Sequence, residues 1–120
     1  MSAFPSLFVY GTLRDANLVY QLTGKSFRSE EAWLLDYERH ELPHTYPFVT
    51  ASPGKCVRGL ILYDVDQESL TAFDRYECRG VLYDRVTARA KTRNGVQEVL
   101  VYVRCKDRLP LREQDGSDGP

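Results

Sequence analysis

Apolar residues in this chain fall into short runs that alternate with two stretches of helical spacing. The run LFVY (residues 7–10) is rich in β-forming residues and ends at a glycine, which predicts a buried strand. Residues 15–24 carry apolar side chains at helical spacing, with Asp15 as a candidate N-cap and Gly24 as a stop. They predict a short helix. Residues 32–40, AWLLDYERH, fit a strand or a helix, and we favour a strand.

The middle of the chain contrasts a turn-rich segment with a strongly apolar one. Residues 43–54 contain three prolines and a glycine, so we expect them to form mostly loop. Residues 56–65, CVRGLILYDV, predict a central strand in which Gly59 leaves room for a close neighbour or a bend.

The second half predicts one helix and one hairpin. Asp66 is a candidate N-cap and Gly80 a candidate C′ residue, which gives a helix of about three turns between them. Two alternating runs then flank Asn94-Gly95, the strongest short-range signal for a β-hairpin.

Together these elements predict the α+β class. Strands outnumber helices and no segment repeats, so we expect a small mixed or antiparallel sheet curled into a barrel-like core, with two or three short helices. A chain of 120 residues is long enough for one domain and too short for two. We place that domain at residues 1–105 and a polar, flexible tail at 106–120.

Charge and cysteine usage narrow the functional classes. The formal net charge is -1, which gives no reason to expect binding to nucleic acid or to an anionic membrane. Three cysteines without CxxC spacing argue against a disulfide framework and a structural zinc site, and Cys56 and Cys105 look like small core residues. The first residues resemble neither a signal peptide nor a membrane anchor. We therefore expect a cytoplasmic protein, a monomer or weak dimer.

The segment HELPH (residues 40–44) matches the HExxH zinc-protease pattern by letter only. That pattern needs a continuous helix, and Pro43 would interrupt one. The chain has no further histidine to serve as a third ligand. We expect no metal and no other cofactor.

Glu77 is the first candidate for chemistry. At 100° per residue it falls between Leu70 and Phe73 on the apolar stripe of the predicted helix, so it should point toward the core or a cavity. One interpretation is a salt bridge to Arg79, Arg85 or another arginine. The other is a desolvated carboxyl with a raised pKa, suited to act as a general base.

The second candidate is VYGTLR (residues 9–14). A buried strand that runs into Gly11 and Thr12 exposes consecutive backbone N–H groups, which can bind a carboxylate or an oxyanion. A plain strand-to-helix turn is the alternative.

Three segments together carry a family resemblance: FVYGTLR, YPFVTASPGKCVRGLILYDV and LTAFDRYECRGVLYDRV. In order, spacing and residue type they resemble the gamma-glutamylcyclotransferase-like family, in particular its gamma-glutamylamine cyclotransferase group, over residues 6–104. One departure is that the family's usual Glu-Gly pair is Glu77-Cys78 here, with glycine delayed to Gly80.

The resemblance implies a fold, an activity and a site. It implies a barrel-like α+β domain that releases pyroglutamate from a small-molecule γ-glutamyl amine or peptide, without a metal or cofactor. It makes Glu77 the catalytic acid or base, and it gives substrate binding to Tyr10, Gly11, Thr12, Leu13 and Tyr83. The alternatives are a non-catalytic binding protein of the same fold, or a γ-glutamyl-removing enzyme of a biosynthetic pathway.

Overall fold

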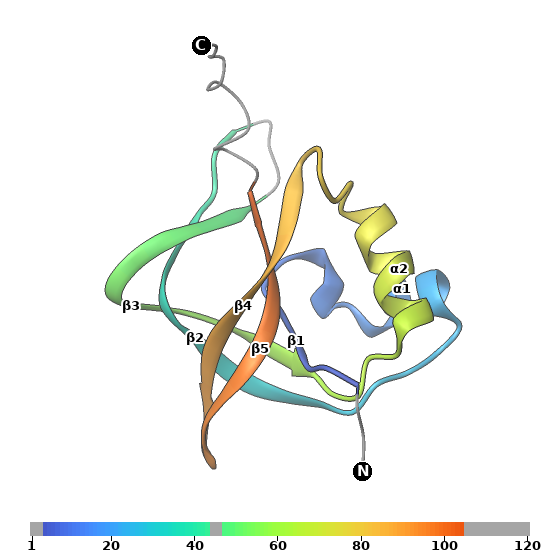
Figure 1. The fold of residues 1–120 in the computed structure, drawn as a ribbon, viewed down its shortest axis with the longest axis horizontal. Coiled ribbons are helices and arrows are strands. Elements are labelled where there is room, and N and C mark those ends of the chain that lie inside the picture. The colour runs from blue at the N-terminus through green and yellow to red at the C-terminus, as the bar shows by residue number, and fades with distance from the viewer. Residues whose placement is uncertain (1–3, 44–46, 105–120) are drawn as a thin grey trace.

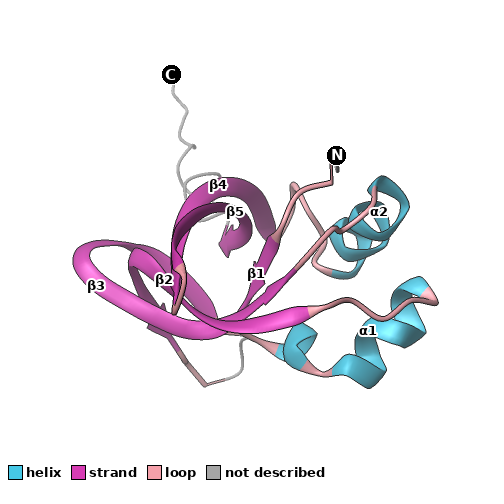
Figure 2. Ribbon diagram, turned by 90° about the horizontal axis from the view of Figure 1, so that it is seen from below, coloured by secondary structure: helices cyan, strands magenta, loops and turns pink. Residues whose placement is uncertain are grey.

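A computed structural model describes residues 4–43 and 47–104. Its elements, in chain order, are β1 (Leu7–Val9), the 3-10 turn η1 (Thr12–Arg14), α1 (Ala16–Thr23), β2 (Ser29–His40), β3 (Phe48–Leu62), α2 (Gln67–Tyr76), β4 (Tyr83–Thr92) and β5 (Gly95–Arg104). The five strands form a closed barrel in the order β1-β3-β2-β4-β5, and both helices lie together on one side of it (Figures 1 and 2). The expected α+β class and barrel-like sheet are confirmed.

The barrel is mixed because its closing pair is parallel. β1 pairs antiparallel with β3 and parallel with β5, and the remaining strand pairs are antiparallel. All three residues of β1 are buried, as expected for a strand covered on both faces.

Buried side chains form two clusters, one on each face of β1. One gathers residues that point into the barrel, including Phe8, Tyr10 and Val49. The other includes Val9 and packs the barrel wall against helix residues such as Phe73. Because β1 contributes to both clusters, the end of this strand is held firmly at the point where Gly11 follows.

The helix and hairpin predictions are largely confirmed. Asp15 caps α1 by accepting a hydrogen bond from the N–H of Asn17, and Gly24 ends the helix in the left-handed region with φ 73°. The β4–β5 hairpin is present, but its two turn residues are Arg93 and Asn94, and Gly95 already pairs with Thr92.

The prediction that residues 43–54 form mostly loop was wrong. Strand β3 begins at Phe48 and continues through Pro53. A register shift explains how the strand accommodates proline: Leu35 pairs with Cys56, whereas Tyr37 already pairs with Ala51. Pro53 therefore lies in a bulge, where its missing N–H costs no ladder hydrogen bond.

Two cysteine predictions have different outcomes. Cys56 is exposed, so its prediction as a core residue was wrong. Side chains alternate along a strand, and because Val57 points into the barrel, Cys56 points out. Cys105 and the proposed tail at 106–120 lie outside the residues that the structure describes.

Candidate active site

The site residues expected from the sequence come together around one cavity of about 280 Å³. Tyr10, Gly11, Thr12, Leu13, Glu77 and Tyr83 all line it. The cavity lies where β1 ends, between η1, the end of α2 and the first residue of β4. Three stretches that are far apart in sequence thus share one pocket.

Glu77 is the C-cap of α2, one residue later than the last helical residue, Tyr76. It is partly buried, and burial raises the pKa of its carboxyl from 4.5 to about 7. Within residues 4–43 and 47–104, its carboxyl has neither an ion pair nor a hydrogen bond. The pKa places the group near the pH at which an acid–base catalyst works best.

The alternative of a salt bridge at Glu77 was therefore wrong for both named arginines. Arg79 and Arg85 are turned toward Asp74 instead, with Nη1 atoms 3.2 Å and 2.8 Å from its Oδ2. Asp74 lies three residues before Glu77 on α2 and already neutralises the cations that could have paired with it.

The helix ends earlier than predicted, and Cys78 rather than Gly80 is the C′ residue. The N–H of Arg79 donates to the carbonyl of Asp74 at 2.9 Å, and the N–H of Cys78 donates to that of Arg75 at 3.2 Å. These two bonds form a Schellman motif, which requires a left-handed C′ residue. Cys78 adopts that conformation with φ 54°, at the position where the family motif has glycine.

Cys78→Gly is accordingly expected to stabilise the protein by about 1 kcal/mol, because a non-glycine residue in the left-handed region is strained by roughly that amount. Chemical denaturation of the variant and the wild-type protein measures the difference. Cys56→Gly, at an exposed strand position, is the matched control and should be destabilising. A lower free energy of unfolding for Cys78→Gly would contradict this account of the helix end.

The turn after β1 presents backbone to the cavity. Arg14 donates from its backbone N–H to the carbonyl of Gly11 at 3.1 Å, which closes η1. Thr12 and Leu13 are the first residues of this turn, so their N–H groups have no partner within it. A Cβ built on Gly11 would have no neighbouring atom within 4 Å, so ligand atoms have room beside this backbone.

Two tyrosines are fixed in the wall by bonds to backbone. The Tyr10 hydroxyl donates to the carbonyl of Tyr102 at 2.6 Å, and the Tyr83 hydroxyl donates to the carbonyl of Pro47 at 2.8 Å. Burial, followed by the proximity of Tyr83 and Glu77, raises the pKa of Tyr10, so this residue is a neutral phenol. Both rings are oriented before a ligand arrives.

The sequence did not indicate every residue of the wall. Tyr76 bonds through its hydroxyl to Thr12 Oγ1 at 2.8 Å and links the end of α2 to the turn after β1. Tyr102 and Pro47 also line the cavity. No pattern in the sequence signals these three, because each acts through a contact with a segment distant in sequence.

Only the first histidine of the HELPH segment lies among the described residues. His40 ends strand β2, and its Nε2 lies 2.8 Å from Thr50 Oγ1 while its ring stacks on Phe48. His44 is outside the described residues. Across the described part of the chain, no three His, Cys, Asp or Glu side chains gather as metal ligands would. Nor does any helix there have the length and apolar character needed to cross a membrane.

Comparison with known structures supports the fold. A solution structure of an Arabidopsis thaliana protein matches with a TM-score of 0.77 and 24% identity, over 88% of this chain and 72% of that one. A structure described as a gamma-glutamyl cyclotransferase matches with a TM-score of 0.67 and 17% identity, over 82% and 65%. An AIG2-like protein from Mus musculus matches with a TM-score of 0.67 and 21% identity, over 84% and 77%. At these identities the likeness concerns the fold alone.

The sequence itself identifies the family. No curated protein matched the chain. The family model for gamma-glutamyl cyclotransferase, AIG2-like proteins matches residues 7–118, which include all of the secondary-structure elements and the whole candidate site. The chain therefore belongs to the AIG2-like gamma-glutamyl cyclotransferase family.

Proposed function

We propose that the protein is a cyclotransferase that acts on a γ-glutamyl amine or γ-glutamyl peptide. The α-amine of the substrate attacks its own γ-carbonyl, the amide bond to the leaving amine breaks, and the products are pyroglutamate and a free amine. The observation that carries the proposal is the partly buried carboxyl of Glu77, which has no ion pair among the described residues and shares a cavity with the backbone turn at Gly11.

This reaction suits a site with few reactive groups. The nucleophile belongs to the substrate, so the protein needs no serine or cysteine nucleophile and no metal-bound water. Holding the γ-glutamyl chain in a folded conformation makes the attack intramolecular, which can lower the barrier by about 7–11 kcal/mol. A cavity of about 280 Å³ with a fixed wall is suited to that role.

The reaction needs proton transfer both from the attacking nitrogen and to the departing one, and we assign both transfers to Glu77. The α-ammonium must lose a proton before its nitrogen can attack, and the departing nitrogen must gain one. A carboxyl with a pKa of about 7 can accept the first proton and return it in the second step. In our proposal the N–H groups around Gly11 and Thr12 bind the substrate carboxylate or the oxyanion.

The test is pyroglutamate release from a panel of γ-glutamyl amines and γ-glutamyl dipeptides, with and without a chelator. We expect release from at least one class, unchanged by the chelator, with a kcat/KM that rises with pH through a limb near pH 7. The sign follows because the free enzyme needs Glu77 ionised to accept a proton, and the carboxyl is ionised above its pKa.

Other outcomes of the same experiment contradict the proposal or change the substrate it names. Binding of the panel compounds without release would support a non-catalytic protein of the same fold. Loss of activity on chelation would exclude the metal-independent mechanism. Release restricted to an elaborated biosynthetic amine would keep the chemistry and assign the enzyme to a biosynthetic pathway.

A further inference from the structure

A polar network at the edge of the cavity ties the last turn of α2 to the barrel, with Asp74 at its centre. Arg85 on β4 donates from Nη1 to both carboxyl oxygens at 2.8 Å, and Tyr102 on β5 donates from its hydroxyl to Oδ1 at 2.6 Å. Arg79 adds a third donor at 3.2 Å. The side chains of Asp74 and Arg85 are only 18% and 14% exposed.

This network is close to Glu77 along the helix. Residues three apart lie on the same side of a helix, so the anchor at Asp74 is one turn from the carboxyl at Glu77. The Asp74 carbonyl also accepts the N–H of Arg79, which closes the turn around Glu77. Fixing Asp74 against two strands therefore fixes the direction in which the helix end leaves.

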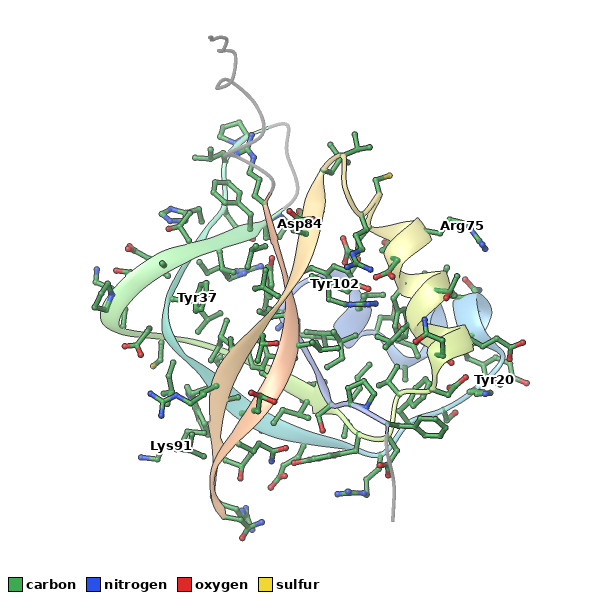
Figure 3. All side chains as sticks on the ribbon, viewed as in Figure 1. Tyr20, Tyr37, Arg75, Asp84, Lys91 and Tyr102 are labelled. Carbon is green, nitrogen blue, oxygen red and sulfur yellow. The ribbon has the colours of Figure 1, made fainter. Side chains whose placement is uncertain are left out.

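Tyr102 connects the network to the opposite wall of the cavity. Its hydroxyl binds Asp74, and its backbone carbonyl accepts the hydroxyl proton of Tyr10. In Figure 3, Tyr102 lies between β5 and α2, whereas Arg75 of the same helix points away from the barrel. A single residue thus links the end of α2, where Glu77 lies, to Tyr10 directly after β1.

The network is poorly explained as a source of stability alone. A largely buried carboxylate loses hydration, and its ion pair roughly offsets that loss, so apolar residues of similar size often serve stability as well. Several charged and hydroxyl donors converging on one carboxylate fix its position with a precision that apolar contacts lack. The desolvation cost of burying Asp74 is explained if the protein needs the last turn of α2 in a fixed position.

We propose that Asp74 is a positioning residue, which together with Arg85 and Tyr102 keeps the Glu77 carboxyl inside the cavity and prevents it from turning into solvent. The part of this inference that concerns catalysis rests on the proposed function. The titratable groups on the cavity wall with Glu77 are Tyr10 directly after β1, Tyr83 of β4, Tyr102 of β5, Tyr76 at the end of α2 and Cys78 directly after Glu77.

The test measures the pKa of Glu77 directly. Proteins labelled with ¹³C at glutamate side chains are titrated by NMR, with Glu77→Gln used to assign the signal. We expect a value near 7 in the wild-type protein, and a fall of one unit or more in both Asp74→Asn and Arg85→Met. In both variants kcat for pyroglutamate release should fall at least tenfold, with a smaller change in KM, and Asp74→Glu should restore part of it.

The two variants separate position from charge. Removing the anion at Asp74 lowers the pKa of a nearby carboxyl by Coulomb effects alone, whereas removing the cation at Arg85 raises it. Shifts of opposite sign would therefore overturn the proposal. A lower melting temperature with an unchanged Glu77 pKa would also overturn it, since the network would then be merely structural.

A control on the same helix and a milder variant complete the design. Asp66→Asn makes the same chemical change at the other end of α2, where Asp66 caps the helix and pairs with Lys25 at 2.9 Å, and it should leave the Glu77 pKa unchanged. If Asp74→Asn does not fold, Tyr102→Phe takes its place, because it removes one hydrogen bond to Asp74. The Glu77 pKa in that variant then tests the proposal. If the wild-type protein releases no pyroglutamate, the proposed function fails, while the pKa comparison still decides the positioning role.

Discussion

Glu77→Gln is expected to lower kcat/KM for pyroglutamate release by about 10²–10⁴-fold, the usual contribution of a general acid–base group. Glutamine keeps the shape of the side chain and cannot exchange a proton in the working pH range. Steady-state kinetics measure the loss, and calorimetric titration with substrate should still detect binding. Glu68→Gln, an exposed glutamate in the first turn of the same helix, is the matched control and should keep full activity. Full activity in Glu77→Gln would remove this residue from the mechanism.

The same variant should be more stable than the wild-type protein at high pH. The folded-state pKa of Glu77 is raised above its unfolded value, so the native state holds its proton more tightly. Wild-type stability should therefore fall as pH rises from about 4.5 to about 7, whereas Glu77→Gln lacks this loss. The two proteins should unfold alike near pH 4 and differ by about 2–3 kcal/mol at pH 8. A less stable variant at pH 8 would mean that Glu77 has a partner in the folded protein.

The second large effect concerns stability alone. Gly59→Ala should destabilise the protein by about 3 kcal/mol, at the upper end of the usual cost of overpacking. A Cβ at this position would lie 2.4 Å from the backbone oxygen of Val9 and 2.7 Å from Cζ of Phe8. The oxygen belongs to β1, which cannot retreat without leaving its partners on both sides. Thermal unfolding should show a melting temperature lower by more than 10 °C.

Gly11→Ala is the matched control for this change. A Cβ at Gly11 meets no atom within 4 Å, so the same substitution should leave the melting temperature nearly unchanged. Equal midpoints for Gly59→Ala and the wild-type protein would contradict the close approach of β1 to β3. The sequence had indicated that Gly59 makes room for a neighbour or a bend, and the structure identifies the neighbour as β1.

Much of the fold was predictable because its signals are local. Capping residues such as Asp15 and Asp66 mark helix starts within a few positions, and the β4–β5 hairpin follows from alternation around one turn. Pro53 misled the prediction because its tolerance in β3 depends on a register shift against β2. That shift is a property of two paired strands, and neither segment reveals it alone.

The site was partly predictable for a related reason. Helical periodicity correctly placed Glu77 facing inward, since it depends only on the spacing to Leu70 and Phe73. It could not decide whether the carboxyl is paired, because nothing in the spacing shows that Arg85 is bound by Asp74 instead. Only the family resemblance predicted that the turn at Gly11 and Glu77 belong to one site. No pattern along the chain indicates that these two segments share a pocket.

The parallel pairing of β1 with β5 also constrains when the barrel can form. Phe8 lies opposite Val101, so the contact that closes the barrel joins residues 93 positions apart in sequence. Closing so long a loop is entropically costly, and folds that depend on such pairings fold slowly. During synthesis β1 cannot pair with β5 until the ribosome has made residues 95–104. The pocket at the end of β1 is therefore completed only when this final strand docks.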